Sequence, residues 1–141
     1  MTNDLSEELR SDRKAARRDY TASLMSNSKW RAVFEALANV RPALSRIDVK
    51  FIGNDHAKPM GLPWLDAPHA FVDSLEFGPF PLVGIEWIEV PSIFLPAASR
   101  EMPATRETQD LDAAWSALEA TGKQLPLSRT RHGIRITGHQ I

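Results

Sequence analysis

Two glutamates in one apolar stretch are the residues of this chain that most invite a chemical role. Glu86 and Glu89 lie within Ile85–Pro91, where their neighbours are isoleucine, tryptophan and valine. Acidic side chains are depleted in strands and are costly to bury without a partner. Each glutamate could therefore act as a general acid or base, or as a metal ligand. The alternative is a structural ion pair, since such pairs also perturb pKa values.

Basic partners for such an ion pair are available in the sequence. They are an arginine of a flanking strand and the C-terminal residues Arg129, Arg131 and Arg135. In a regular strand, Glu86 and Glu89 point to opposite faces because side chains alternate. We therefore predict that they do not form a carboxylate pair of the kind that glycosidases and aspartic proteases use.

Four histidines are the other candidates for acid–base chemistry. His56 and His69 lie in or beside a long loop over 53–68, and His132 and His139 flank the last predicted strand. None belongs to an HxH or HExxH motif, and the chain has no cysteine. Because zinc sites are built from such ligands, we predict neither a metal nor a cofactor.

The common nucleophile and nucleotide motifs are also missing. The chain contains no G-x-S-x-G elbow, no P-loop and no G-x-G-x-x-G. The pair Gly78-Pro79 cannot cradle a phosphate, because proline lacks the backbone N–H that would bind it. No enzyme class is indicated by a motif.

Two aromatic residues are candidates for contact with a partner. Trp64 lies in the proline-rich segment Gly61-Leu62-Pro63-Trp64-Leu65, and Phe80 lies in the turn before the glutamate-bearing strand. Aromatic side chains are common anchors of protein interfaces. The alternative is that each is buried against its own domain.

The elements that must position these residues are both helices and strands. Large apolar residues between Trp30 and Leu37 recur with helical spacing and predict a helix over 28–40. A second helix is predicted from Leu111 to a stop at Gly122. Strands are predicted over 46–51, 70–77, 82–90, 125–127 and 133–137.

This order of elements predicts an α+β fold. We expect a single globular domain over 28–141, with a mainly antiparallel sheet of four to five strands and two or three helices packed mostly on one face. The segment 1–27 is charged and poor in large apolar residues, so it is predicted to be a marginal helix or partly disordered. At 141 residues with 43% hydrophobic content, the chain is large enough to bury a core.

The charge balance argues against nucleic-acid and membrane partners. The net charge is −1, and the first 20 residues hold five basic and five acidic groups. A mixed charge run is typical of a solvated helix face stabilised by i, i+4 pairs. No apolar run is long enough to span a bilayer, and the absence of cysteine suits a reducing compartment. We therefore predict a cytoplasmic protein with a protein partner or a homodimeric state.

Several stretches of the sequence look like those of a known family. They are Lys29-Trp30-Arg31-Ala32-Val33-Phe34-Glu35-Ala36-Leu37, Val49-Lys50-Phe51-Ile52, Phe77-Gly78-Pro79-Phe80 and Ile85-Glu86-Trp87-Ile88-Glu89-Val90-Pro91. This combination resembles a family of small, single-domain bacterial proteins of unknown function, over about residues 28–139. The resemblance implies a stand-alone bacterial cytosolic domain, and it supplies no catalytic residues because the family has no assigned activity.

The leading functional hypothesis is a non-enzymatic protein-interaction module of the immunity or antitoxin kind. It rests on the small size, the lack of a catalytic motif, and the acidic and aromatic strand and loop; the link to immunity proteins is an analogy. The competing hypothesis is a small-molecule-binding domain or a hydrolase-like enzyme. In that case Glu86 or Glu89 would be the acid or base, with His56 or His69 assisting. The pocket would lie between the long loop and the glutamate-bearing strand.

Overall fold

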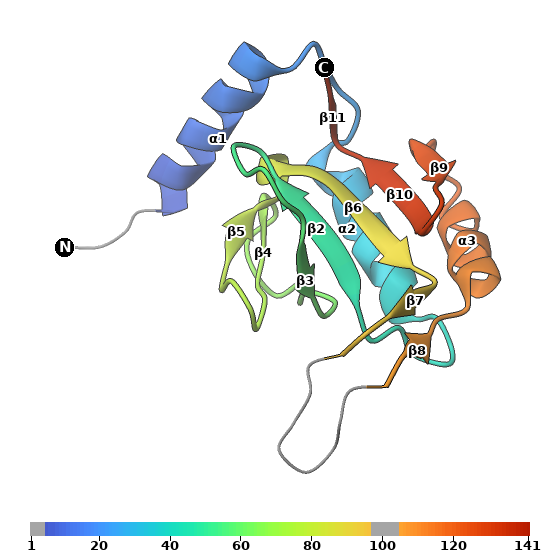
Figure 1. The fold of residues 1–141 in the computed structure, drawn as a ribbon. Coiled ribbons are helices and arrows are strands. Elements are labelled where there is room, and N and C mark those ends of the chain that lie inside the picture. Colours follow the sequence, from blue (N-terminus) through green and yellow to red (C-terminus); the bar gives the residue numbers. More distant parts are fainter. Residues whose placement is uncertain (1–4, 97–104) are drawn as a thin grey trace.

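Three helices and eleven strands form within the residues that the computed structural model describes, 5–96 and 105–141 (Figure 1). The helices are α1 (Leu5–Asp19), α2 (Asn27–Ala38) and α3 (Leu111–Glu119), with a 3₁₀ turn, η1, over Leu82–Gly84. The strands are β1 (Ala22–Ser23), β2 (Ile47–Phe51), β3 (Lys58–Met60), β4 (Phe71–Val72), β5 (Phe80–Pro81), β6 (Ile85–Pro91), β7 (Ile93–Phe94), β8 (Glu107–Thr108), β9 (Leu127–Arg129), β10 (Gly133–Thr137) and β11 (His139–Gln140).

Five of these strands form one antiparallel sheet in the order β3-β2-β6-β10-β9. The helices α2 and α3 pack on one face of this sheet (Figure 1). The other face, called the open face below, carries the side chains of Asp48, Lys50, Trp87, Glu89 and Arg135. The predicted α+β class, with a mainly antiparallel sheet and helices on one face, is confirmed.

The core lies between the sheet and the two helices. Its fully buried side chains are Trp30, Val33, Phe34 and Leu37 of α2, Leu118 of α3, and Ile47, Val49, Ile88, Val90, Ile134 and Ile136 of the sheet. Each such side chain stabilises the fold by about 1.5–3 kcal/mol through removal of apolar surface from water. The helical spacing read from the sequence therefore identified the inward face of α2 correctly.

Local chemistry sets the helix ends. The Ser26 hydroxyl accepts a hydrogen bond from the Lys29 amide at 3.1 Å, and the Asp110 carboxylate accepts one from the Ala113 amide at 3.0 Å. Both are N-caps, which satisfy amides that have no partner within the helix. After α3, Gly122 has a φ of +72°, a conformation that glycine adopts without strain. The predicted stop at Gly122 is confirmed.

Two predicted strands are shorter than expected. The strand expected over 70–77 is limited to β4, because the Ser74 hydroxyl accepts a hydrogen bond from the Phe77 amide at 3.0 Å and closes a turn. The strand expected over 82–90 begins at Ile85, because η1 precedes it. The short strand expected at 125–127 is shifted to β9.

The charged N-terminal segment forms a regular helix. α1 docks against η1 and β5 through Ala16, which is buried (Figure 1). Of the segment 1–27, predicted to be a marginal helix or partly disordered, residues 1–4 lie outside the described residues. None of the described helices has the length and apolar character needed to cross a membrane.

Candidate functional site

A β-bulge at Glu86 decides where the two strand glutamates point. In the pairing of β2 with β6, Lys50 lies opposite Trp87 but Phe51 lies opposite Ile85, so Glu86 has no counterpart on β2. The extra residue shifts the alternation of side chains, and both carboxylates reach basic residues of the open face. The prediction that they lie on opposite faces is therefore wrong, because it assumed an unbroken period of two.

Glu89 is buried within the open face and is bonded through both carboxylate oxygens. Arg135, directly opposite on β10, donates from Nε and Nη2 to Oε1 at 3.1 and 2.9 Å. The Thr130 hydroxyl donates to Oε2 at 3.2 Å. The same guanidinium lies 3.8 Å from the centre of the Trp87 ring, a cation–π contact. One of the three C-terminal arginines thus compensates this carboxylate.

Glu86 links the sheet to the segment that follows α1. Its Oε1 atom lies 2.7 Å from Lys50 Nζ and accepts a hydrogen bond from the Tyr20 hydroxyl. Burial, and then the hydrogen bond to Glu86, raise the pKa of Tyr20 above its ordinary value. Tyr20 therefore remains a protonated donor at neutral pH. This carboxylate is also compensated, and it joins β6 to a residue that lies 66 positions away in sequence.

The candidate histidines His56 and His69 are not bonded to the glutamates, whereas His132 lines the same surface hollow as Glu89 without bonding to it. His56 is exposed after β2, and His69 Nε2 lies 3.4 Å from the Ser28 hydroxyl. His139 is buried, with Nε2 2.7 Å from the Val83 carbonyl oxygen. Within residues 5–96 and 105–141, no histidine is bonded to either glutamate. No group of three His, Asp or Glu side chains in these residues is arranged to hold a metal ion.

A hollow of about 540 Å³ lies over the open face. Its polar and aromatic walls are formed by Arg46, Asp48, Trp87, Glu89, His132 and Arg135. The acidic residues are paired, because Arg46 Nη2 lies 2.9 Å from Asp48 Oδ1 and Arg135 holds Glu89. The hollow therefore offers guanidinium N–H groups and an aromatic face, and its carboxylates are engaged in structural pairs.

Gln109 fixes one wall of this hollow, and no pattern in the sequence singles it out. Its Oε1 atom accepts hydrogen bonds from the Ser45 and Arg46 amides at 2.7 and 3.0 Å. Its Nε2 atom donates to the Arg46 and Pro91 carbonyl oxygens at 3.0 and 2.9 Å. One amide side chain thereby joins the residues before β2 to the end of β6.

The two aromatic candidates for partner contact have different environments. Trp64 is 52% exposed, and its backbone is paired with that of Asp73. Leu75, in the turn that follows Asp73, is 82% exposed. Phe80 is buried, and its ring packs edge-on against Phe51 with centroids 5.0 Å apart. Trp64 and Leu75 are therefore available at the surface, whereas Phe80 belongs to the core and is removed from the candidates.

Arg31 of α2 holds the loop that carries Trp64. Its guanidinium donates to the carbonyl oxygens of Leu65, Pro68, His69 and Phe71. One planar cation thus satisfies acceptors of a loop that has little regular structure of its own. The segment 53–68, which was expected to be a loop throughout, also contains the edge strand β3, because its backbone pairs with β2. Arg31 holds the part that follows, between Leu65 and Phe71.

A second hollow, of about 320 Å³, lies between α1 and the sheet. It is lined by Glu8 and Asp12 of α1 and by Phe51 and Phe77. Burial, and then the neighbouring Glu8 carboxylate, raise the pKa of Asp12 to about 6. Its Oδ2 atom faces Gly84, where the absence of a side chain leaves it room.

We expect Asp12→Asn to stabilise the protein at neutral pH. A raised folded-state pKa means that the folded chain holds the proton more tightly than the unfolded chain, so wild-type stability falls as pH rises from about 4 to 6. The variant lacks this loss and should be more stable by about 1 kcal/mol above pH 7, a value reduced for the solvent screening of a half-exposed group.

Urea unfolding at pH 4 and at pH 7.5 measures this difference. The two proteins should be nearly equal at pH 4 and should separate at pH 7.5. Asp112→Asn is the matched control, because Asp112 is exposed on α3 and its side chain is 95% accessible. Equal stability of wild type and Asp12→Asn at both pH values would show that Asp12 is fully hydrated.

Comparison with known proteins places the chain in a family without supplying a function. Residues 12–141 match the family described as "Family of unknown function (DUF6678)". The chain belongs to this family. The match begins at Asp12, so it covers the second half of α1 and Tyr20 as well as the region of about 28–139 over which the sequence resembles such a family. No curated protein and no solved structure matches the chain. DUF6678 membership therefore leaves the function to be argued from the geometry above.

Proposed function

We propose that this DUF6678 protein is a protein-interaction module without catalytic activity, of the immunity or antitoxin kind. The observation that carries the proposal is the exposure of Trp64, on a loop that Arg31 holds in place, and of Leu75, on the turn beside it. Large apolar side chains displayed on a fixed backbone lose little conformational freedom on binding, which favours affinity. Tryptophan is also among the residues most enriched at the energetic centres of interfaces.

The state of the glutamates supports the same proposal. A general acid or base must exchange a proton with a substrate. Glu86 is bonded to Lys50 and Tyr20, and Glu89 to Arg135 and Thr130. Such pairing is what a structural role requires. The immunity or antitoxin comparison rests on small size and fold alone and remains an analogy.

Replacement of both Trp64 and Leu75 by alanine is expected to abolish partner binding. Affinity capture from a lysate of the source organism should enrich a protein with the wild-type chain, and the double variant should lose it. Truncation of one central tryptophan commonly weakens binding by about 2 kcal/mol or more, roughly 30-fold. Ile141→Ala is the matched control, because Ile141 is also apolar and is 85% exposed.

The same experiment separates the remaining possibilities. If the chain itself is the partner, light scattering should report a dimer that the double variant cannot form. If the double variant and Ile141→Ala retain the partner equally, the Trp64 surface is not the docking site. If no protein is enriched and a metabolite co-purifies, the interaction module is the wrong assignment.

One observation favours a second candidate, the small-molecule-binding domain. The hollow over the open face combines Trp87 with two arginines, a set that suits a flat or anionic ligand. A hydrolase-like reaction has less support, because it needs a free acid or base beside a histidine. Arg46→Ala should weaken a ligand held in this hollow while leaving Trp64-dependent capture unchanged.

A further inference from the structure

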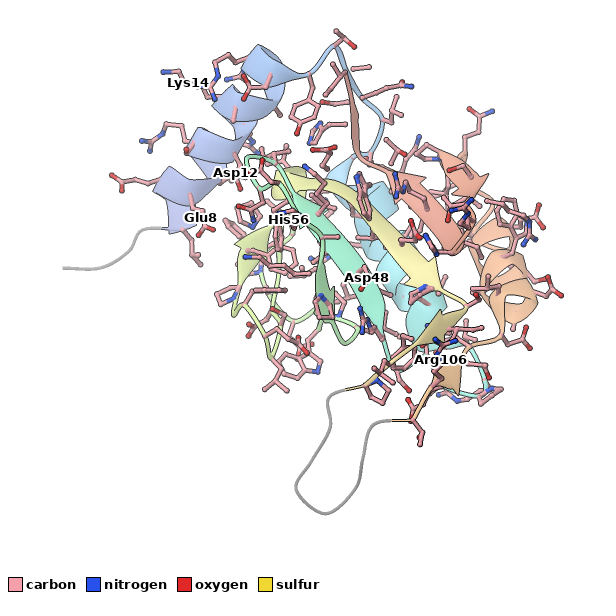
Figure 2. All side chains as sticks on the ribbon, in the orientation of Figure 1. Glu8, Asp12, Lys14, Asp48, His56 and Arg106 are labelled. Atoms are coloured by element: carbon pink, nitrogen blue, oxygen red, sulfur yellow. The ribbon has the colours of Figure 1, made fainter. Side chains whose placement is uncertain are left out.

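The tertiary structure sorts the charged residues of α1 onto two sides. The exposed basic residues are Arg10, Arg13, Lys14, Arg17 and Arg18. Glu8 and Asp12 lie on the other side, where they line the hollow between α1 and the sheet. Figure 2 shows Lys14 directed away from the body of the molecule and Asp12 directed toward it. Glu7 and Asp19 are also exposed, and Asp19 is paired with Arg18, so the solvent side of α1 carries five basic and two acidic side chains and is basic on balance.

This arrangement opposes the stability of the helix. Basic residues follow one another at i, i+4 in Arg10 and Lys14, in Arg13 and Arg17, and in Lys14 and Arg18. Like charges at this spacing destabilise a helix by roughly 0.2–0.5 kcal/mol per pair. The exposed face also includes Glu7, which lies three residues before Arg10. The ion pair found on α1 joins the adjacent residues Arg18 and Asp19.

Glu7 and Glu8 in the first turn and Arg17 and Arg18 in the last turn suit the helix dipole and offset part of this cost. Local sequence rules that are broken at a particular surface are typical of a functional site. Four of the five exposed basic residues are arginines, whose planar guanidinium matches a carboxylate with two parallel hydrogen bonds. We propose that the basic face of α1, formed by Arg10, Arg13, Lys14 and Arg17, docks against an acidic protein surface. This inference deepens the proposed interaction function and rests on it by naming the charge of the partner.

The same structure argues against the two other classes of anionic partner. A membrane-binding helix needs its apolar side free to enter the lipid, but α1 packs on η1 and β5, Ala16 is buried, and Leu5 and Leu9 are partly buried. A nucleic-acid-binding domain is usually strongly basic as a whole, with a pI above about 9. Here the pI is about 6.4 and the net charge is −1. Binding to an acidic protein surface requires neither a free apolar side nor a strongly basic domain, so the basic face of α1 is sufficient for it.

Charge reversal of this face tests the inference. The variant carries Arg10→Glu, Arg13→Glu, Lys14→Glu and Arg17→Glu, and the probe is a fluorescent peptide of glutamates. The matched control reverses four exposed basic residues elsewhere, Lys58, Arg106, Lys123 and Arg131, and so changes the net charge equally. Anisotropy at low and physiological salt should show at least about a tenfold loss of affinity for the variant, and about twofold or less for the control.

Two further probes complete the test. A DNA duplex and vesicles with anionic lipid are titrated against the same proteins, and circular dichroism checks that each variant keeps its helices. Equal loss of peptide binding in variant and control would overturn the inference, because it would reflect net charge alone. Tighter binding of the duplex or the vesicles, lost only in the α1 variant, would overturn it in favour of that partner.

The test separates this inference from the proposed function. The variant with Trp64→Ala and Leu75→Ala should bind the glutamate peptide as wild type does. If peptide binding is absent while Trp64-dependent capture persists, the α1 inference fails and the interaction module stands. If capture fails while peptide binding persists through α1, the Trp64 surface is the part that must be abandoned.

Discussion

Replacing Arg135 by methionine is expected to lower the free energy of unfolding by about 3 kcal/mol, the effect of leaving a buried carboxylate without its cation. Glu89 is only 5% exposed, and Arg135 supplies two of its hydrogen bonds. Asp48 lies directly opposite Glu89 on β2, so the loss of the cation also leaves two acidic residues as neighbours. Methionine keeps an apolar stem over Trp87, which isolates the effect of the charge.

Replacing the carboxylate and keeping the cation should lower the free energy of unfolding by less. Glu89→Gln removes the negative charge and leaves Arg135, whose side chain is 36% exposed and can turn to water. We expect a loss of about 1 kcal/mol, the scale of an ordinary hydrogen bond. A variant with both Arg135→Met and Glu89→Gln has no uncompensated charge at this site and should recover most of the stability lost by Arg135→Met alone.

Urea unfolding of the four proteins forms a double-mutant cycle that measures the coupling directly. A larger loss for Glu89→Gln than for Arg135→Met would contradict this account. It would mean that Glu89 is well hydrated through the hollow over the open face. The carboxylate would then be available for chemistry, and the enzyme hypothesis would regain support.

The second large effect is expected at Arg31. Arg31→Lys should destabilise the protein by about 2–3 kcal/mol and should also weaken partner capture, although the charge is unchanged. The Arg31 guanidinium spans four carbonyl oxygens between Leu65 and Phe71. A lysine ammonium is a compact point charge and cannot reach all four carbonyl oxygens. The loop would gain freedom, and the exposed Trp64 would have to be ordered again on binding.

Arg41→Lys is the matched control for this prediction. Arg41 also donates to backbone carbonyls, those of Ala38 and Val40, but these acceptors lie within three residues and the side chain is exposed. Arg41→Lys should change the free energy of unfolding by less than about 0.5 kcal/mol. Hydrogen exchange of the 65–71 amides separates the two outcomes: faster exchange in Arg31→Lys alone supports the clamp, and unchanged exchange contradicts it.

Local patterns were sufficient to predict much of the fold. The helical spacing between Trp30 and Leu37 identified α2 and its buried face, and the capping and stop residues placed the helix ends within a few positions. The alternation in 46–51 and 133–137 identified β2 and β10. These features depend on residues that are close together in the sequence, and periodic patterns report such local relationships.

The candidate site was predicted less well, because its residues depend on contacts between segments that are far apart in the sequence. Glu86 and Glu89 were correctly singled out, but a bulge that arises only when β6 pairs with β2 placed both on one face. Phe80 looked like a surface aromatic because of its turn, yet the packing of Phe51 and Phe77 against it buries it. Arg31, Gln109 and Tyr20 bind groups 18 to 66 positions away, and no local pattern reports such contacts.

The sequence by itself determined the composition, the fold class, the main helices and the residues able to bear charge. The tertiary structure alone decided what those charges meet. It paired Glu86 with Lys50 and Glu89 with Arg135, and it turned Glu8 and Asp12 of α1 toward the sheet and the basic residues of that helix outward. The physical reason is that secondary structure follows from nearby side chains, whereas the compensation of a charge depends on which distant segment folding brings beside it.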